Sequence, residues 1–509
     1  MKRLLAFSCL CPGLSTILFA QAGGEVTGDS PRMAGLAGSG LAGGVDLTEA
    51  SHNPAMLGFL LNSERSGQFE FSLRGVSNPV IGTNIGGDRF NSSDFNGLGP
   101  WLGIGFALPG NFAAGLNVVP TAGGSLQMSR LTELNIAADE SVPGSGVFDL
   151  PREHWVEVQN EILQLSVDPS LSWSPAPGVS FGLGASFRST TMNLGSATEF
   201  DLGKLQGEPP PPLNGIGATW GEFLKELGTL SGRELSHFQV DYSAQAEADM
   251  LSYLRVGFAW ESDKGTRVGF WYRPPSTKTD LSGTVDIDLD ADLGDLIREV
   301  FDEDTPTTSS YDLDITDIRF PQQIGLACMT PASRFDRLHF QAIWTEWSDT
   351  FDGWTANLTN GDNDQFSDML GGDGSTDFDL DNEWNDSFFL SCGWEHDWTW
   401  APAPWARRQI AANGKVTEGW DVTSRLGLGW ASNPVSGSMV PGLMPFNQWH
   451  VGGGMSLRSA PFGGHWNLGF VIALPESIKV GENNVLSDLS NDTYRQSNYA
   501  LMVGYSRSW

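Results

Sequence analysis

The chain ends in SNYALMVGYSRSW, residues 497–509, a stretch in which bulky and small side chains alternate. A period of two places successive side chains on opposite faces of an extended strand, so the stretch predicts a β-strand with one apolar face. A terminal edge strand of a soluble sheet would alternate in the same way, and the rest of the chain must decide between the two. The bulky face carries Tyr499, Leu501, Val503, Tyr505, Arg507 and Trp509.

The composition argues against an ordinary soluble enzyme. The chain of 509 residues holds 62 Gly and 19 Trp, and 61 acidic residues against 29 Lys and Arg give a formal charge of -32. Aromatic side chains at a lipid–water boundary, and glycines where backbones approach closely, would explain the excess of both types. Because the chain offers no basic footprint, we expect no nucleic-acid partner.

The first residues, MKRLLAFSCLCPGLSTILFAQAG, predict a signal peptide over residues 1–22. Lys2 and Arg3 form its positive region, residues 4–19 its apolar region, and residues 20–22 an A-x-A cleavage site. A buried first helix is the alternative. Since no later run of 18 apolar residues follows, the sequence predicts an exported protein without a transmembrane helix.

Alternation of the same kind recurs along the whole chain and indicates about fourteen strands. A β-sandwich would also alternate, but it rarely needs so many tryptophans at strand ends. A transmembrane barrel places its apolar face on lipid, carries aromatic girdles at both interfaces, and leaves no open edge, so we predict this fold. Trp509 then ends a closing strand and contributes to the signal that the outer-membrane assembly machinery recognises. The alternating segments lie at 69–73, 102–108, 112–121, 161–173, 181–187, 256–260, 268–272, 324–328, 338–344, 388–394, 426–430, 451–457, 466–474 and 499–509.

Two cysteines follow the predicted signal peptide, on the bulky faces of the segments that we count as strands eight and ten. With one strand between them, Cys328 and Cys392 would lie roughly 9–10 Å apart. This separation exceeds the reach of a disulfide, so we expect none.

Two stretches break the strand pattern and are typical of short amphipathic helices. The first follows the Pro209–Pro212 run, and the second lies in DADLGDLIREVF. Either they line an apolar substrate groove at the barrel mouth, or they are surface helices that cap loops. The candidate groove residues are Trp220, Phe223, Leu224 and Leu227 in the first stretch and Leu296, Ile297, Val300 and Phe301 in the second.

The acidic stretch NGDNDQFSDMLGGDGSTDFDLDNEWND, residues 360–386, raises the question of a calcium site. It lacks the order of an EF-hand loop, so a solvated extracellular loop is the preferred interpretation. No catalytic residues, metal site or cofactor are expected, because the chain has neither an H-E-x-x-H nor a G-x-S-x-G motif. A barrel hydrolase with a Ser–His pair has no support in the sequence.

Residues 30–60 read SPRMAGLAGSGLAGGVDLTEASHNPAMLGFL, in which small residues lead through an acidic segment to Asn53, Pro54 and Ala55. This stretch resembles the N-terminal hatch of the FadL/TodX-type outer-membrane transporters of hydrophobic compounds. Further segments resemble the strands of that family in the same order along the chain. They are DPSLSWSPAPGVSFGLGASF (168–187), RVGFWYRPPSTKTDLSGTVDI (267–287), FPQQIGLACM (320–329), FQAIWTEWSD (340–349) and the Gly- and Pro-rich stretch 425–458.

The resemblance implies a fourteen-stranded barrel over residues 66–509, with residues 23–65 forming a hatch inside its lumen. It implies passive uptake of long-chain fatty acids or aromatic hydrocarbons through the outer membrane of a Gram-negative-type bacterium, in contact with lipid and lipopolysaccharide. The Asn-Pro-Ala motif would then act as a gate or merely anchor the hatch. Arg188, Arg233 and Arg273 could hold a fatty-acid carboxylate, but no motif chooses among them.

Two other functions stay open on the sequence. A general porin would use the same barrel but would lack a plugging N-terminus, and would therefore conduct ions well. A secretion-associated or interaction barrel of the same superfamily would use the acidic loops to dock protein partners.

Overall fold

The protein was analysed as a computed structural model, and its described residues cover most of the chain beyond residue 28. They are 21–22, 25–26, 29–44, 46–61, 65–77, 79–83, 89–91, 96–133, 153–211, 218–230, 237–290, 307–350, 354–371, 374–380, 384–398, 409–410, 416–418, 420–434, 448–459, 464–479 and 493–509. The predicted signal peptide thus lies almost wholly outside them.

Fourteen antiparallel strands form a closed barrel, as the sequence predicted. The ring closes where the last strand pairs with the first, from Tyr499 opposite Ser77 to Ser508 opposite Gln68. Closure satisfies the backbone groups that a sheet edge would leave unpaired in lipid. In ring order the strands are β3 (Gly67–Ser77), β6 (Asn96–Leu108), β7 (Phe112–Glu133), β8 (Glu153–Ala176), β9 (Val179–Asp201), β10 (His237–Glu261), β11 (Arg267–Arg273), β14 (Gln323–Pro331), β15 (Asp336–Thr345), β18 (Ser387–Trp398), β21 (Trp420–Ala431), β22 (Trp449–Ser459), β23 (Gly464–Lys479) and β24 (Thr493–Ser508).

The two faces of the wall follow the alternation seen in the sequence. In β24, Leu501 is 54% exposed on the outside, whereas Ala500 and Met502 are buried inside. Trp509 pairs with Gly67 through both backbone bonds, 3.1 and 3.0 Å, and its ring meets Phe106 edge-on. The outer face is therefore an apolar band of the kind that contacts lipid, and Trp509 does end the closing strand.

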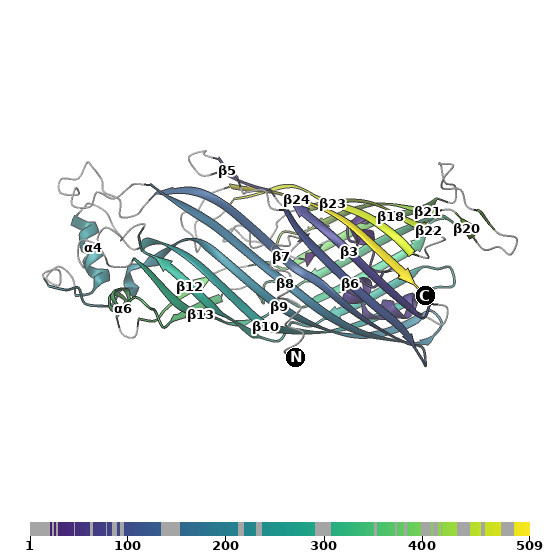
Figure 1. Cartoon of the computed structure of the whole chain (residues 1–509), viewed down its shortest axis with the longest axis horizontal. Coiled ribbons are helices and arrows are strands. Elements are labelled where there is room, and N and C mark those ends of the chain that lie inside the picture. The colour runs from purple at the N-terminus through teal and green to yellow at the C-terminus, as the bar shows by residue number, and fades with distance from the viewer. Residues whose placement is uncertain are drawn as a thin grey trace.

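The barrel has two different ends (Figure 1). The short-turn end carries the C-terminus and the tight connections at 109–111, 177–178, 262–266 and 332–335. In the first of these turns, Gly110 and Asn111 adopt the positive φ that glycine and asparagine tolerate best. At the long-loop end the sheet continues beyond the fourteen strands. The additional strands are β4 (Val80–Thr83), β5 (Arg89–Asn91), β12 (Thr279–Asp288), β13 (Thr308–Ile318), β16 (Trp354–Thr359) and β17 (Thr376–Leu380).

Short helices lie inside the barrel and at its long-loop end, with α4 and α6 at the far left of Figure 1. Among the helices that the structure describes, none is long and apolar enough to cross a bilayer. Two small hairpins, β1 (Gln21–Ala22) with β2 (Glu25–Val26) and β19 (Gln409–Ile410) with β20 (Val416–Glu418), complete the elements. The helices are α1 (Pro31–Gly35), α2 (Glu49–His52), η2 (Pro54–Met56), α3 (Leu57–Leu60), η4 (Leu202–Lys204), α4 (Trp220–Leu230) and α6 (Asp364–Leu370).

The two cysteines lie where the strand count placed them, in the eighth and tenth strands of the ring. Cys328 of β14 and Cys392 of β18 are both opposite Phe340 of the intervening strand β15. Both thiols are free.

Candidate functional site

Residues 30–61, which we term the lumen segment, are packed against the inner face of the wall, drawn in purple inside the barrel in Figure 1. The end of helix α1 and the residues just after it, Ala34 to Ser39, lie on a row of cross-strand neighbours, Gly393, Gly427 and Gly452. A Cβ atom at Gly427 would collide with the backbone of Leu36, and one at Gly452 with the carbonyl of Ala34. The glycines between the bulky wall residues therefore make room for a backbone inside the barrel.

The Asn-Pro-Ala motif docks on the opposite side of the lumen, where Gly182 and Gly257 face each other in β9 and β10. A Cβ atom on Gly182 would collide with Pro54 and Ala55. The amide nitrogen of Asn53 donates to the carbonyl of Phe258 at 3.2 Å, and its oxygen accepts from the backbone N–H of Ala55 at 3.1 Å. The motif is thus a wall contact that also caps η2, and a role in gating stays a prediction.

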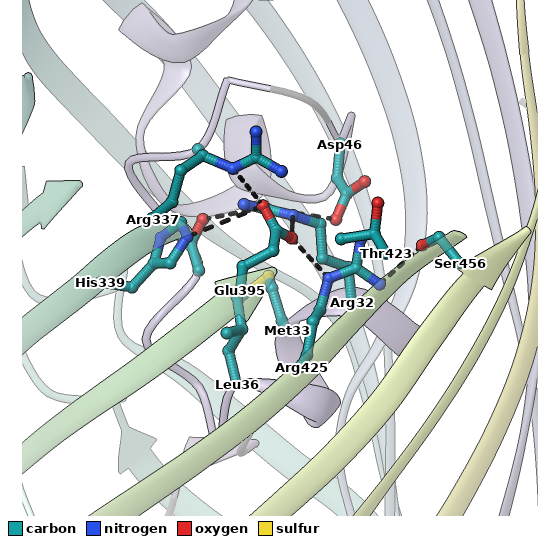
Figure 2. Close-up of polar contacts among 12 residues, drawn as sticks. Arg32, Met33, Leu36, Asp46, Arg337, His339, Glu395, Thr423, Arg425 and Ser456 are labelled. Carbon is teal, nitrogen blue, oxygen red and sulfur yellow. Dashed lines mark hydrogen bonds and ion pairs between the residues drawn. The ribbon is translucent and has the colours of Figure 1, made fainter. Parts of the chain in front are cut away.

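A buried ion-pair cluster joins α1 to the wall (Figure 2). Glu395 of β18 accepts from the Nε of Arg32 at 3.1 Å and from the Nε of Arg337 at 2.7 Å, and it also pairs with Arg425. Arg32 in turn donates to Glu49 of the lumen segment at 3.1 Å. One wall carboxylate therefore serves three guanidinium groups, and only one of these belongs to the segment.

The charge on Arg32 is stabilised by this arrangement. Burial alone would lower the pKa of its guanidinium, but the carboxylates of Glu395, Asp46 and Glu49 outweigh burial and raise this pKa above its usual value. Removing one partner from such a cluster leaves an uncompensated buried charge, which typically costs about 3–5 kcal/mol. Loss of either Arg32 or Glu395 should consequently weaken the attachment of the segment to the wall.

Three more arginines form a second group, which we term the lumen arginine cluster: Arg188 and Arg273 lie over the ring of Tyr253, and Arg255 lies near both. The guanidinium carbons of Arg188 and Arg273 lie 4.4 and 5.2 Å from the ring centre. Arg255 pairs with Asp168 at 3.4 Å and also donates to the Ser51 carbonyl of the lumen segment.

The lumen arginine cluster places several positive charges close together in the protein interior. All three arginines are at least nine-tenths buried. Within the described residues Arg188 contacts neutral groups, the Tyr253 ring and the Gln164 amide oxygen at 3.1 Å. Arg188 and Arg273 both repel the charge of Arg255. A group of this kind favours an incoming oxyanion.

Beyond this cluster, toward the long-loop end, lies an apolar core that we term the apolar cap. Helix α4 contributes Trp220 and Phe223, whose rings meet edge-on at 5.6 Å, and Leu224, which is fully buried. Helix α6 is tied to the α4 region through the Gly207 N–H, which donates to the Met369 carbonyl at 3.0 Å. Helix α6 contributes Phe366 and Leu370. The remaining members come from the inner faces of neighbouring strands and include Phe200, Phe238, Val240, Leu281, Val285, Ile287, Tyr311, Leu313, Ile315 and Leu358.

The first predicted amphipathic helix exists as α4, and Trp220, Phe223 and Leu224 form its buried face. These side chains are packed in the apolar cap, and their role in a substrate groove stays a prediction. The Leu227 side chain, the whole second stretch with Leu296, Ile297, Val300 and Phe301, and Arg233 lie outside the described residues. Of the three arginines singled out, the structure brings Arg188 and Arg273 together.

The acidic stretch 360–386 is more than a solvated loop. It folds into α6 and β17, and Phe366 and Met369 are each 1% exposed in the apolar cap. Within the described residues, no group of His, Cys, Asp and Glu is arranged to hold a metal ion. The stretch has a few apolar residues at helical spacing among many acidic ones. Because the acidic residues dominate its composition, the sequence predicted a loop where the structure has a helix.

The sequence did not predict three charged residues of these clusters, Arg255, Glu395 and Arg425. Each lies at a buried, inward position of a barrel strand, and Arg255 lies between the outward apolar residues Leu254 and Val256. A charged residue at an inward position of a predicted strand was therefore the signal that could have identified these residues in the sequence.

On the other side of the lumen segment, at the short-turn end, lies a polar cavity of about 870 Å³. We term it the short-turn cavity. Its described lining contains seven arginines and four carboxylates. These are Arg32, Arg65, Arg267, Arg334, Arg337, Arg425 and Arg458 with Asp46, Glu261, Glu395 and Asp397.

A closed fourteen-stranded barrel with an apolar outer band and a segment packed in its lumen has the architecture of a transmembrane β-barrel. No family profile and no curated protein match the sequence. Solved structures match closely in shape. The toluene transporter TodX of Pseudomonas putida aligns with a TM-score of 0.64 and 15% identity, over 96% of this chain and all of that one.

Two further structures agree. The Ralstonia pickettii toluene transporter TbuX aligns with a TM-score of 0.59 and 15% identity, over 95% of this chain and 99% of that one. A FadL homologue of Pseudomonas aeruginosa aligns with a TM-score of 0.60 and 14% identity, over 96% and 99%. The chain therefore has the fold of the FadL/TodX-type channels over nearly its whole length, as the resemblance implied.

Proposed function

We propose that this protein is a passive outer-membrane channel for hydrophobic compounds, with long-chain fatty acids as its cargo, and that it is not an enzyme. Its structural neighbours are channels and transporters of hydrophobic compounds. Short turns face the periplasm and long loops the exterior in bacterial barrels, so the apolar cap would meet the cargo first. Trp509 would serve the assembly machinery as the end of the last strand.

The lumen arginine cluster beneath the apolar cap carries the fatty-acid part of the proposal. A fatty acid combines a long apolar chain with one carboxylate. Here apolar side chains of β9 and β10, such as Met192 and Ala248, lead along the inner face toward Arg188 and Arg255. The tail would therefore lie among cap residues while the carboxylate meets guanidinium groups, which bind carboxylates well when buried.

Uptake of labelled oleate tests the proposal, in cells that lack their own fatty-acid transporter. Uptake above the empty vector is expected, and the double variant Arg188→Gln/Arg273→Gln should reduce it by about tenfold through the loss of charged hydrogen bonds. The matched control is Arg319→Gln, which removes a half-buried arginine paired with Asp349 at the long-loop end. No uptake by a correctly inserted barrel would rule out this cargo.

Aromatic hydrocarbons are the second candidate, because TodX and TbuX are toluene transporters of the same fold. Toluene carries no charge, so its uptake should not depend on Arg188 and Arg273. Uptake of labelled toluene by both the wild type and the double variant, without uptake of oleate, would favour this cargo.

A general porin or a protein-docking barrel would give different results. A porin would conduct ions well in a planar bilayer even with residues 30–61 in place. A docking barrel would retain envelope proteins through its acidic loops and lose them when residues 359–386 are trimmed.

A further inference from the structure

The short-turn cavity has a sign of charge opposite to that of the protein as a whole. The chain carries 61 acidic residues against 29 basic ones, yet the described lining of the cavity has seven arginines against four carboxylates. Guanidinium groups gathered around a partly enclosed space concentrate anions there.

Several of these arginines already have carboxylate partners. Glu395 takes up Arg32, Arg337 and Arg425, as described above, and Arg267 pairs with Glu261 at 3.2 Å. The positive charge that is available to a ligand must therefore come from elsewhere in the lining.

Arg458 and Arg334 supply it. In the part of the chain that the structure describes, neither has a carboxylate within ion-pair distance, and Arg334 instead lies over the ring of Phe335 at 5.5 Å. Arg458 is exposed to the cavity and is the cross-strand neighbour of His465, near which Asp46, Arg65 and Arg425 also lie. Arg458 and Arg334 are thus the arginines whose charge is available in the described lining.

A second polar group in the cavity is buried without hydrogen bonds. His339 is completely buried, and neither of its ring nitrogens makes a hydrogen bond within the described residues, although Nε2 lies 3.9 Å from Glu395. Buried polar groups normally have partners, so an unpaired imidazole in the wall of a charged cavity indicates a missing one.

We propose that the short-turn cavity is an oxyanion site, which binds a carboxylate or phosphate group through Arg458 and Arg334. Guanidinium groups bind both anions through paired hydrogen bonds. The ligand could be a free anion on the short-turn side or the carboxylate of the transported cargo after it has passed the lumen segment. The second source rests on the proposed function, whereas the first does not.

Titration calorimetry on the full chain in neutral detergent micelles tests the site, with inorganic phosphate and hexanoate as probes at low salt. Both should bind, and Arg334→Gln/Arg458→Gln should weaken binding at least about tenfold. Arg319→Gln controls for a general loss of charge. Arg188→Gln/Arg273→Gln shows whether hexanoate binds at the lumen arginine cluster instead.

Each result decides something. Binding of both probes that is weakened only by Arg334→Gln/Arg458→Gln supports a site that cargo can use. Binding of phosphate alone supports the site with a free anion as its ligand. Absence of binding, or binding unchanged in that variant, overturns the proposal. Failure of oleate uptake would count against the proposed function and would leave the phosphate result standing.

Discussion

The two halves of the lumen segment are held in the barrel by different physical means. Residues 30–49 depend on charge, since Arg32 pairs with Glu395 and the Leu47 N–H donates to Glu70 at 2.9 Å. Residues 50–61 make no ion pair with the described residues of the wall, and are held by hydrogen bonds, one of them from Arg255 to the Ser51 carbonyl, and by apolar packing, with Leu57 and Leu60 in a core against the wall. We term residues 30–49 the charged half and residues 50–61 the neutral half. The ion-pair attachment of the charged half depends on a single carboxylate, that of Glu395, whereas the attachment of the neutral half is spread over many weak contacts.

This difference has a consequence for opening of the lumen. Separating the partners of a buried ion pair costs much free energy at once, because each charge stays buried without its partner. Neutral contacts cost less free energy each and can be lost one after another. If the segment moves during transport, the charged half should set the free energy of the first step. Variants that affect one half at a time can test this view.

Removal of the charged half and most of the neutral half should have the largest effect on ion conductance. Deleting residues 23–57 should leave a folded barrel, because these residues contribute no strand to the ring of fourteen. Ion conductance in planar bilayers should rise roughly tenfold or more, since barrels of similar size leave an aqueous channel when unfilled. Heat-modifiable gel mobility confirms folding. A folded deletion variant that stays electrically silent would show that the segment does not block the lumen.

Glu395→Gln should release the charged half alone. Three arginines lose their shared counter-charge, at a cost of about 3–5 kcal/mol to the docking of residues 30–49. Hydrogen exchange on backbone amides should show lost protection in these residues and little change in 50–61.

Asp397→Asn is the matched control for Glu395→Gln. This carboxylate lies on the same strand and face but pairs with Arg337 alone among the described arginines, and its side chain is 36% exposed. The expected cost is below about 1 kcal/mol. Equal loss of protection in both halves after Glu395→Gln would contradict the distinction between them.

Gly427→Val should also loosen the charged half, but by packing. The side chain would collide with the Leu36 backbone, and overpacking of this kind costs about 1–3 kcal/mol. The control is Leu428→Val, one residue further along the same strand, which points outward and is 44% exposed. Conductance should rise in the first variant and stay unchanged in the second.

The sequence predicted the wall well because each strand face is encoded locally. Alternation alone placed Leu501 and Trp509 outside, and it placed Cys328 and Cys392 two strands apart in the ring. Such patterns depend only on neighbouring residues and on the period of an extended chain.

The candidate site could be predicted only in part, because its contacts join distant segments. Arg32 and Glu395 are 363 positions apart, and neither residue has a local motif that names its partner. Arg188 and Arg273 were recognised as possible carboxylate ligands, but only the register of the strands brings them onto one tyrosine ring. Tertiary pairing, and not local propensity, determines this part of the protein.

Asn53→Ala tests the neutral half and should have the smallest effect. The variant loses the bond to the Phe258 carbonyl and the cap on Ala55, and each net hydrogen bond is worth about 0.5–1.5 kcal/mol. Hydrogen exchange should show a modest loss of protection confined to residues 50–61. Asn117→Ala is a useful comparison, since Asn117 of the wall donates to the Ser51 hydroxyl at 2.9 Å and also to the Leu47 carbonyl of the charged half at 2.9 Å.

The two asparagine variants also separate anchoring from gating. If the motif only anchors the segment, both variants should loosen it equally and change cargo uptake to the same small extent. If Asn53 takes part in opening, its variant should change uptake by much more than Asn117→Ala at equal loss of protection. Because the motif sits against Gly182 and Gly257, where the wall leaves no room for another side chain, we expect the first result.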